Sequence, residues 1–394
     1  MRVLVTFRSG SGHFHPIAPF ARALQTAGHD VAFATAASFA PQVEASGFRC
    51  FPAGIDGAQV REEFPELRAL AGIPLREFFR QRIFPSILPE RMLPDLVEIA
   101  TSWAPDLVLR DSGEFAGCVV AEYRGIPHAS IGFSQGGAFP YRIRRTYAPQ
   151  MAVLRASVGL PPDPGGDMLF RYLHLISAPP SMQAPGVERP PTAYFVQRVV
   201  FDLSGDERLP AWVAALPARP TIFATLGTVF NKDASVFAAI LAALQDEPIN
   251  LILAVGRDVD PAQFGPCPEN VHIERYIPLS LLMPHCDLVL CHAGFGTVMA
   301  ALEHGIPLVN IPISADNPEI AARCAELGFS VTVPADERTP EAIRSAVRTV
   351  LASAAYRTHA ERLRDEMAAL PSLEHAVVLL ERLASEKTPF IDHQ

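Results

Sequence analysis

Residues 292–297, with the sequence His-Ala-Gly-Phe-Gly-Thr, combine residue types that could bind a phosphate group. The apolar run 288–290 before them predicts a short buried strand, and the stretch 298–303 after them predicts a helix. The turn would therefore lie at a helix N-terminus, where free backbone N–H groups and the positive end of the helix dipole attract an anion. The glycines would let the backbone approach a ligand closely, and His292 would add a donor.

Two other interpretations of this region have to be weighed. A Gly-x-Gly-Thr turn is common in α/β proteins, and a histidine that ends a buried strand is often a hydrogen-bonded structural residue. A metal site built from His285, Cys286, Cys291 and His292 is disfavoured, because two cysteines five residues apart in a strand point to opposite faces. A further apolar run, 308–312, ends in Ala-Asp-Asn-Pro at 315–318, and open α/β sheets bind ligands at such carboxyl ends.

The elements that would position these residues form two similar series. In the first half we expect strands at 3–7, 31–35, 106–110 and 128–131, with a helix from about 16 to 27. In the second half we expect strands at 221–225, 250–255, 271–273, 288–290 and 308–312, with a helix near 234–246. Strands that alternate with helices indicate parallel sheets, so we predict an α/β protein of two Rossmann-like domains that face one another across a cleft.

The 394-residue chain is long enough for two such domains. We expect an N-terminal domain over 1–205, a linker at 206–219, a C-terminal domain over 220–375, and a tail at 376–394 that could pack back on the first domain. The proline-rich stretch 161–191 is expected to break regular structure. The segment 55–94 reads as irregular, and it could form a binding wall or lid, or plain surface helices.

Composition narrows the class of protein further. Apolar residues make up 49% and charged residues 19%, with a mean hydropathy of +0.18, which is typical of a compact globular chain. No apolar run approaches the ~20 residues that span a bilayer, and no signal peptide is evident, so we expect a cytoplasmic protein without a membrane span. The net charge of −9 argues against nucleic acid as a partner. A homodimer is left open.

In its motifs the chain resembles the bacterial nucleotide-sugar-dependent glycosyltransferases that decorate natural products, such as macrolide and enediyne antibiotics. These enzymes have the GT-B architecture of two Rossmann-like domains, and the resemblance covers nearly the whole chain. It rests on the order and spacing of these segments: 12–16 (Gly-His-Phe-His-Pro), 105–111, 209–212 with 225–228, 276–279 with 281–282, and 285–318.

For the first domain the resemblance implies a pair of catalytic residues. His13 matches the general base that takes the proton from an acceptor hydroxyl, a task suited to an imidazole near neutral pH. Asp111, at the end of another strand, would hold the imidazole and stabilise its protonated form. His15, two residues after His13, is the second candidate for the base.

For the second domain the resemblance implies a donor site that needs no divalent metal and no cofactor beyond the nucleotide-sugar co-substrate. The one Asp-x-Asp match, Asp258 to Asp260, lies in a turn after a strand and is read as coincidental. The Ile277 backbone would meet the base, and Asp316 with Asn317 would bind the sugar. The diphosphate would be held by the following residues: Gly227, Thr228, His292, Gly294, Phe295, Gly296 and Thr297.

Three departures from the family pattern bear on the donor. Asn317 stands where members commonly have Gln, Ala300 stands where plant relatives have a glutamate for the ribose, and Leu279 replaces a frequent Gln. These departures favour a deoxysugar on a TDP donor over UDP-glucose.

The predicted function is thus inverting, metal-independent transfer of a sugar to a hydroxyl of an apolar natural-product aglycone, which would lie against parts of 55–95 and 133–147. Two alternatives remain: a nucleotide-sugar epimerase or hydrolase of the same architecture, and a catalytically silent homologue that activates a partner enzyme.

Overall fold

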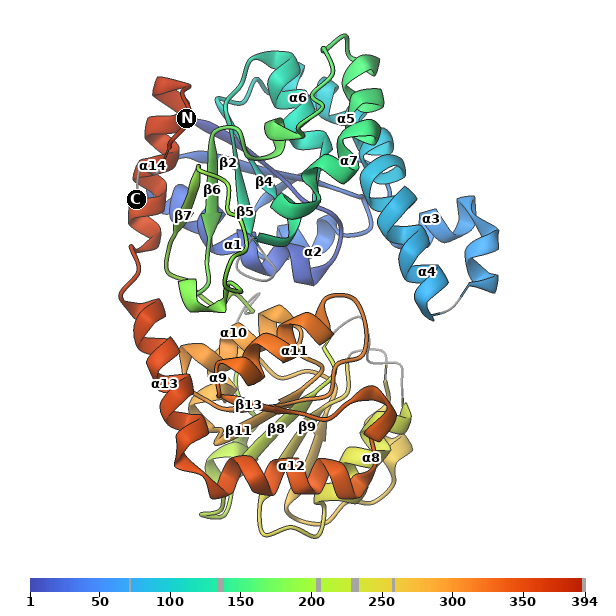
Figure 1. The fold of residues 1–394 in the computed structure, drawn as a ribbon, viewed down its shortest axis with the longest axis vertical. Coiled ribbons are helices and arrows are strands. Elements are labelled where there is room, and N and C mark those ends of the chain that lie inside the picture. The colour runs from blue at the N-terminus through green and yellow to red at the C-terminus, as the bar shows by residue number, and fades with distance from the viewer. Residues whose placement is uncertain (71, 133–137, 203–206, 228–233, 257–258, 392–394) are drawn as a thin grey trace. The chain divides into compact units, whose positions relative to one another are not determined.

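The computed structural model describes the chain except for residues 71, 133–137, 203–206, 228–233, 257–258 and 392–394. The chain forms two compact units (Figure 1). Unit 1 comprises 1–178, 185–205 and 370–394, and unit 2 comprises 179–184 and 206–369. Each unit is built on a parallel sheet, which confirms the prediction of two α/β domains. That the domains face one another across a cleft stays a prediction.

The sheet of unit 1 has the strand order β3-β2-β1-β4-β5-β6-β7, and all its pairs are parallel. Alternate residues of β1 are buried on opposite faces of the sheet. Val3 and Val5 pack with helices α1 and α14 on one face, and Leu4 packs with α5, α6 and α7 on the other. The strands are β1 (Arg2–Thr6), β2 (Asp30–Thr35), β3 (Arg49–Pro52), β4 (Leu107–Asp111), β5 (His128–Gly132), β6 (Leu173–Ile176) and β7 (Ala193–Phe195).

The helices of unit 1 are α1 (Ser11–Thr26), α2 (Ala40–Ala45), α3 (Gly57–Glu63), α4 (Gly72–Phe78), α5 (Leu88–Ser102), α6 (Ala116–Arg124), α7 (Ala138–Ser157) and α14 (Leu373–Glu386). Helix α14 packs against α1 in the core of this unit. It begins three residues before the tail that was predicted at 376–394. The four strands expected in this half are present. The strands β3, β6 and β7 were missed, because each is only three or four residues long, and β6 also lies within the proline-rich stretch that was expected to lack regular structure.

The helix α1 begins five residues before the predicted start at Pro16, although Pro16 and Pro19 lie inside it. The amides of His13 and Phe14 both donate to the Gly10 carbonyl at 3.0 Å, which starts the helix. Phe14 is buried in the aromatic core, so packing outweighs the unfavourable prolines. His13 therefore lies in the first turn of a helix and not in a loop.

The described residues of segment 55–94 are mostly helical, which agrees with the alternative of surface helices, whereas a role as a binding wall or lid stays a prediction. The segment contains α3, two turns of 3₁₀ helix η1 (Pro65–Ala69), α4, the π-helix η2 (Phe79–Ile87) and the start of α5. Prolines divide it into short pieces, but the capping box at the start of α3, formed by Asp56 and Gln59, was a readable signal. Figure 1 shows that α3 and α4 stand out from the sheet of unit 1.

The sheet of unit 2 has the order β10-β9-β8-β11-β12-β13, again parallel. Its strands are β8 (Thr221–Thr225), β9 (Asn250–Ala254), β10 (Val271–Glu274), β11 (Leu288–Cys291), β12 (Leu308–Asn310) and β13 (Ser330–Thr332). The predicted strands and the helix α8 are confirmed. The helices are α8 (Ala234–Leu244), α9 (Leu279–Leu282), α10 (Phe295–Glu303), α11 (Asn317–Glu326), α12 (Pro340–Ala352) and α13 (Ala354–Ala368).

Short 3₁₀ turns complete the connections: η4 (Asp167–Phe170) in unit 1, and η5 (Pro180–Met182), η6 (Ala211–Ala215), η7 (Pro261–Phe264), η8 (Met283–His285) and η9 (Ala335–Glu337) in unit 2. Within the described ranges, no helix combines the length and the apolar character that crossing a bilayer requires.

Candidate active site

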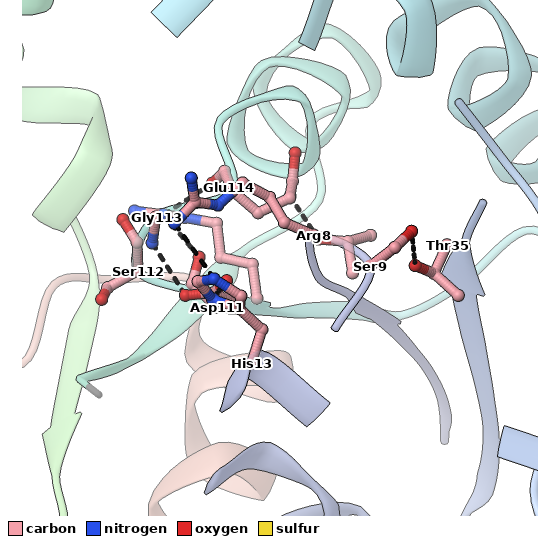
Figure 2. Close-up of polar contacts among 10 residues, drawn as sticks. Arg8, Ser9, His13, Thr35, Asp111, Ser112, Gly113 and Glu114 are labelled. Carbon is pink, nitrogen blue, oxygen red and sulfur yellow. Dashed lines mark hydrogen bonds and ion pairs between the residues drawn. The ribbon is translucent and has the colours of Figure 1, made fainter. Parts of the chain in front are cut away.

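The strand order places His13 and Asp111 together. In unit 1 the order reverses between β1 and β4, which are neighbours with Thr6 opposite Arg110. Loops that leave the carboxyl ends of two such strands diverge and open a crevice, where α/β proteins bind ligands. Asp111 is the last residue of β4, and His13 follows β1 in the first turn of α1. Figure 2 shows both side chains at this edge of the sheet.

The two side chains are in direct contact. His13 Nδ1 lies 2.6 Å from Asp111 Oδ2, and the aspartate side chain is 2% exposed, against 22% for the imidazole. The other carboxylate oxygen accepts a hydrogen bond from the Gly113 amide at 2.9 Å. Burial acts to raise the pKa of Asp111, but His13, Arg8 and the Gly113 amide together hold this pKa below its ordinary value. Asp111 is therefore ionised at neutral pH and oriented toward the histidine.

The other ring nitrogen of His13 contacts an arginine that the sequence analysis did not select. Arg8 Nη2 lies 3.2 Å from His13 Nε2 (Figure 2). A guanidinium can only donate, so Nε2 accepts, and the proton of the neutral imidazole is on Nδ1, facing Asp111. This tautomer presents a lone pair on Nε2, as a general base requires. Asp111 contacts His13, and the assignment of His13, rather than His15, as the base stays a prediction.

The loop that carries Asp111 is held by Arg110, whose side chain is fully buried. Its Nη1 donates to the carbonyl oxygens of Asp111, Ser112 and Glu114 at 3.2, 3.3 and 2.9 Å, and its Nη2 donates to the Leu169 carbonyl. One side chain thus satisfies four backbone acceptors around the loop. Arg110 lies in a motif that carried the family resemblance, but no role was predicted for it.

Glu114 holds the other end of this loop, where α6 begins. Its carboxyl group accepts from the Thr6 hydroxyl at 2.5 Å and from the amides of Ala116 and Gly117 at the helix start. Burial raises the pKa of Glu114. Gly117 has to be glycine, because a Cβ there would lie 2.3 Å from Thr6 Oγ1. The loop between β4 and α6 is therefore fixed at both ends.

Unit 2 repeats this geometry with different side chains. Its strand order reverses between β8 and β11, and His292 follows β11 while Gly227 follows β8. A Cβ on Gly227 would lie 2.5 Å from His292 Cε1, and a Cβ on Gly294 would lie 2.4 Å from Nε2. The imidazole is thus seated between two positions that only glycine can occupy without a shift. Thr228, predicted beside Gly227, lies outside the described residues.

His292 is a neutral group in this setting. Burial lowers the pKa of His292 from 6.5 to about 4, and a hydrogen bond with the Thr225 backbone acts in the opposite direction. The imidazole therefore carries a single N–H at neutral pH, and donation of this N–H to the Thr225 backbone leaves the other ring nitrogen as a hydrogen-bond acceptor.

The turn after His292 begins a helix earlier than predicted. Helix α10 starts at Phe295, and the Thr297 amide donates to the Gly294 carbonyl at 3.0 Å, so it is already engaged. The first-turn amides of Phe295 and Gly296 have no carbonyl four residues earlier in the helix and point out of its N-terminus. Ala293 is held at φ 63°, a strained conformation of the kind that concentrates at ligand sites.

The remaining predicted donor residues lie on other loops of unit 2. Ile277 precedes α9 with its side chain buried, which leaves only its backbone for the predicted contact with a base. Asp316 is half-buried before α11, directly after Ala315, which has φ 56°. Asn317 is buried, and its Oδ1 accepts from the Ser314 amide at 3.1 Å.

The Asp-x-Asp sequence does not form a visible metal clamp. Asp260 caps η7 by accepting from the Ala262 amide and pairs with Arg275 at 3.1 Å, while Asp258 lies outside the described residues. Across the described ranges, no three His, Cys, Asp or Glu side chains gather as metal ligands would. Metal independence stays a prediction.

Comparison with known proteins identifies the family. The N-terminal and C-terminal domain models of the erythromycin biosynthesis protein CIII-like family match residues 76–227 and 238–383. The chain is 32% identical to 4'-demethylrebeccamycin synthase of Lentzea aerocolonigenes, over 97% of this chain and 99% of that one. It is 26% identical to aclacinomycin-T 2-deoxy-L-fucose transferase of Streptomyces galilaeus, over 98% and 97% of the two chains.

Among solved structures, the glycosyltransferase VinC in complex with dTDP matches with a TM-score of 0.81 and 27% identity, over 98% of this chain and 100% of that one. The shared architecture, the aligned length and the two matched domain models agree with the two parallel-sheet units described above. The chain therefore belongs to the erythromycin biosynthesis protein CIII-like family of bacterial natural-product glycosyltransferases and is itself a glycosyltransferase of the GT-B fold.

Proposed function

We propose that this glycosyltransferase moves a deoxysugar from a TDP donor to a hydroxyl of an apolar aglycone, with inversion at the anomeric carbon and without a metal ion. The observation that carries the proposal is the His13–Asp111 pair, 2.6 Å apart, in which Nδ1 faces the carboxylate and Nε2 is the ring's acceptor atom. The pair has the arrangement of a base and its orienting carboxylate.

The reaction needs one in-line displacement. The acceptor hydroxyl gives its proton to His13 Nε2 while its oxygen forms a bond to the anomeric carbon. The bond from that carbon to the diphosphate oxygen breaks, and the electron pair leaves with the nucleoside diphosphate. Asp111 stabilises the imidazolium that forms, and a single displacement inverts the configuration.

The donor half of the proposal is supported by unit 2. Negative charge grows on the departing diphosphate, and hydrogen-bond donors fixed in advance at that place stabilise it most effectively. The first-turn amides of Phe295 and Gly296 are such donors, and the buried His292 ring packs against the glycine turn that leads to them. A solved relative holds dTDP and a curated relative is named for 2-deoxy-L-fucose, which supports a TDP-deoxysugar here.

The acceptor half is supported by the helical segment of unit 1. Its apolar cluster has three fully buried residues, Val60, Leu67 and Ile83. Other apolar side chains pack on it only partly buried, namely Ile55, Phe64, Leu70, Leu75, Phe78, Phe79, Phe84, Ile87 and Leu88. Half-buried aromatic rings beside a catalytic base suit a flat, apolar aglycone.

A transfer assay tests the proposal. A panel of apolar aglycones is incubated with TDP-deoxysugars, and products are detected by mass spectrometry and their anomeric configuration by NMR, with and without EDTA. We expect an inverted product that forms equally well with EDTA. The His13→Ala variant should lose transfer by about 100-fold or more, because general-base catalysis contributes about that factor, whereas His15→Ala should retain it.

Four outcomes contradict the proposal in different ways. Full transfer by His13→Ala removes the catalytic assignment, and a retained configuration removes the single displacement. Loss of activity in EDTA that is restored by a divalent ion removes metal independence. Epimerised or hydrolysed donor without glycosylated product favours the alternative enzyme of the same architecture.

A further inference from the structure

We propose that Arg8 is a further catalytic residue, which binds the acceptor oxygen and stabilises the negative charge that develops on it as His13 removes its proton. This inference rests on the proposed function and adds to it a group that the sequence analysis did not select.

The position of Arg8 brings it to the reacting oxygen. Its Nη2 lies 3.2 Å from His13 Nε2, the atom that has to receive the acceptor proton. A hydroxyl that donates to Nε2 must take the place of this hydrogen bond, so its oxygen arrives next to the guanidinium. Figure 2 shows Arg8 and Asp111 on either side of the His13 ring. A donor released from Nε2 can then turn to the incoming oxygen.

Arg8 interacts with the charge of Asp111 without forming a direct ion pair in the described residues. In the part of the chain that the structure describes, no carboxylate oxygen lies within 4.0 Å of its guanidinium nitrogens, and Asp111 is engaged by His13 and Gly113. A guanidinium has five N–H donors, and one of them is used on His13. Burial lowers the pKa of Arg8, and Asp111, Tyr147 and Glu114 act in the opposite direction. The group stays charged at neutral pH, because an arginine pKa is so high.

The surroundings of Arg8 strengthen the attraction of its guanidinium to the acceptor oxygen. Its guanidinium stacks over the Phe84 ring, with Cζ 4.1 Å from the ring centroid. Phe84 belongs to the π-helix η2, and π-helical segments recur at functional sites. An apolar ring on one side keeps water from the cation, so its attraction to a nascent alkoxide is stronger than it would be in water.

The reaction step is balanced without any proton transfer to or from Arg8. The acceptor O–H bond breaks and its proton goes to His13 Nε2, while the oxygen bonds to the anomeric carbon and the diphosphate leaves. Arg8 donates hydrogen bonds to that oxygen throughout and exchanges no proton. The competing explanation is a purely structural arginine that anchors Phe84 and the helix η2.

The test compares Arg8→Met, Arg8→Gly and Arg8→Lys in the transfer assay with one accepted aglycone. Arg82→Met is the matched control, because Arg82 also stacks on a ring of this helical segment, with Cζ 5.4 Å from the Phe78 centroid, and is exposed. We expect Arg8→Met to lower kcat by about 100-fold, the usual effect of removing one such donor. TDP affinity, measured by calorimetry, should be unchanged, and Arg82→Met should match the unmodified enzyme.

Two further readouts separate charge stabilisation from anchoring. Added guanidinium chloride should restore transfer by Arg8→Gly at least in part, and Arg8→Lys should retain more activity than Arg8→Met. Transfer by Arg8→Met at the unmodified rate overturns the inference and leaves the proposed function standing. So does a loss that neither guanidinium nor lysine repairs. An unmodified enzyme that transfers no sugar overturns both proposals.

Discussion

At the scale of single residues, the orientation of the His13 ring depends on Asp111. An amide in place of the carboxylate would donate to Nδ1, so the imidazole would carry its proton on Nε2 and could not act as a base. We predict that Asp111→Asn lowers kcat by roughly 100-fold to 10,000-fold, as in other histidine–aspartate pairs, with the fold preserved.

Initial-rate kinetics check this prediction against Asp106→Asn, at the other end of the same strand, where Oδ2 accepts from the Arg2 amide at 2.7 Å. If both variants lose the same activity, the loss is not specific to the orienting role of Asp111.

The sequence could predict residues that end central strands but not the residues around them. His13, Asp111 and His292 each follow an apolar run, and parallel strands deliver such residues to one edge of the sheet. Arg8, after β1, and Arg110, inside β4, also lie at this edge, but a charged residue near the end of a strand is usually solvated. Only the contacts of Arg8 with His13 and of Arg110 with four carbonyls show otherwise.

At the scale of elements, the β11–α10 turn is shaped by the fit of the His292 ring. A methyl group on Gly294 would lie 2.4 Å from Nε2, although the backbone of Gly294 itself, at φ −66°, suits alanine. We predict that Gly294→Ala lowers the free energy of unfolding by about 2 kcal/mol, as overpacking does. In a His292→Ala background the same change should cost much less.

Urea unfolding of the four proteins of this double-mutant cycle measures the coupling between the two positions. Equal costs of Gly294→Ala in both backgrounds would show that the imidazole is not what excludes the methyl group.

Helix α14 gives a second test at this scale, because a C-terminal segment completes the core of unit 1. Leu380 is fully buried against α1 and the sheet, whereas Val378, two residues earlier, is 48% exposed. We predict that Leu380→Ala costs about 3 kcal/mol of unfolding free energy, and that Val378→Ala costs less than about 0.5 kcal/mol. Chemical denaturation followed by circular dichroism provides both values, and similar costs would argue against this packing.

Long, strongly apolar elements were predictable, and short or proline-bearing ones were not. The strands β1, β4, β8 and β11 are runs of apolar residues that are buried on both faces. The bounds of the helices in 55–94 were not predicted, because proline is a poor guide where tertiary packing supports a π-helix such as η2, with Pro85 inside it.

At the scale of the whole molecule, buried His292, in the proposed donor site, makes the stability of the protein depend on pH. The pKa of His292 is about 4 in the folded protein and 6.5 when unperturbed. The unfolded chain therefore binds a proton below pH 6.5 that the folded chain binds only near pH 4. His292 therefore contributes to the free energy of unfolding above pH 6.5, the pKa in the unfolded chain. This contribution is lost as the pH falls toward about 4, the pKa in the folded protein.

We predict that His292 makes unit 2 about 2 kcal/mol less stable at about pH 5 than at about pH 7.5. Urea unfolding in a Trp103→Phe background, where Trp212 reports on unit 2, measures this change. The His292→Gln variant should lack it. An equal pH dependence in both proteins would assign the effect to other groups.

We propose that the two units have separate tasks, in which unit 2 holds the nucleoside diphosphate and His13 in unit 1 activates the acceptor. Calorimetric titration of TDP into the unmodified protein, His13→Ala and His292→Ala distinguishes these tasks. We predict equal affinity for the first two proteins and at least about tenfold weaker binding, or roughly 1.4 kcal/mol, for His292→Ala. Absence of TDP binding, or its loss in His13→Ala with retention in His292→Ala, would contradict the account.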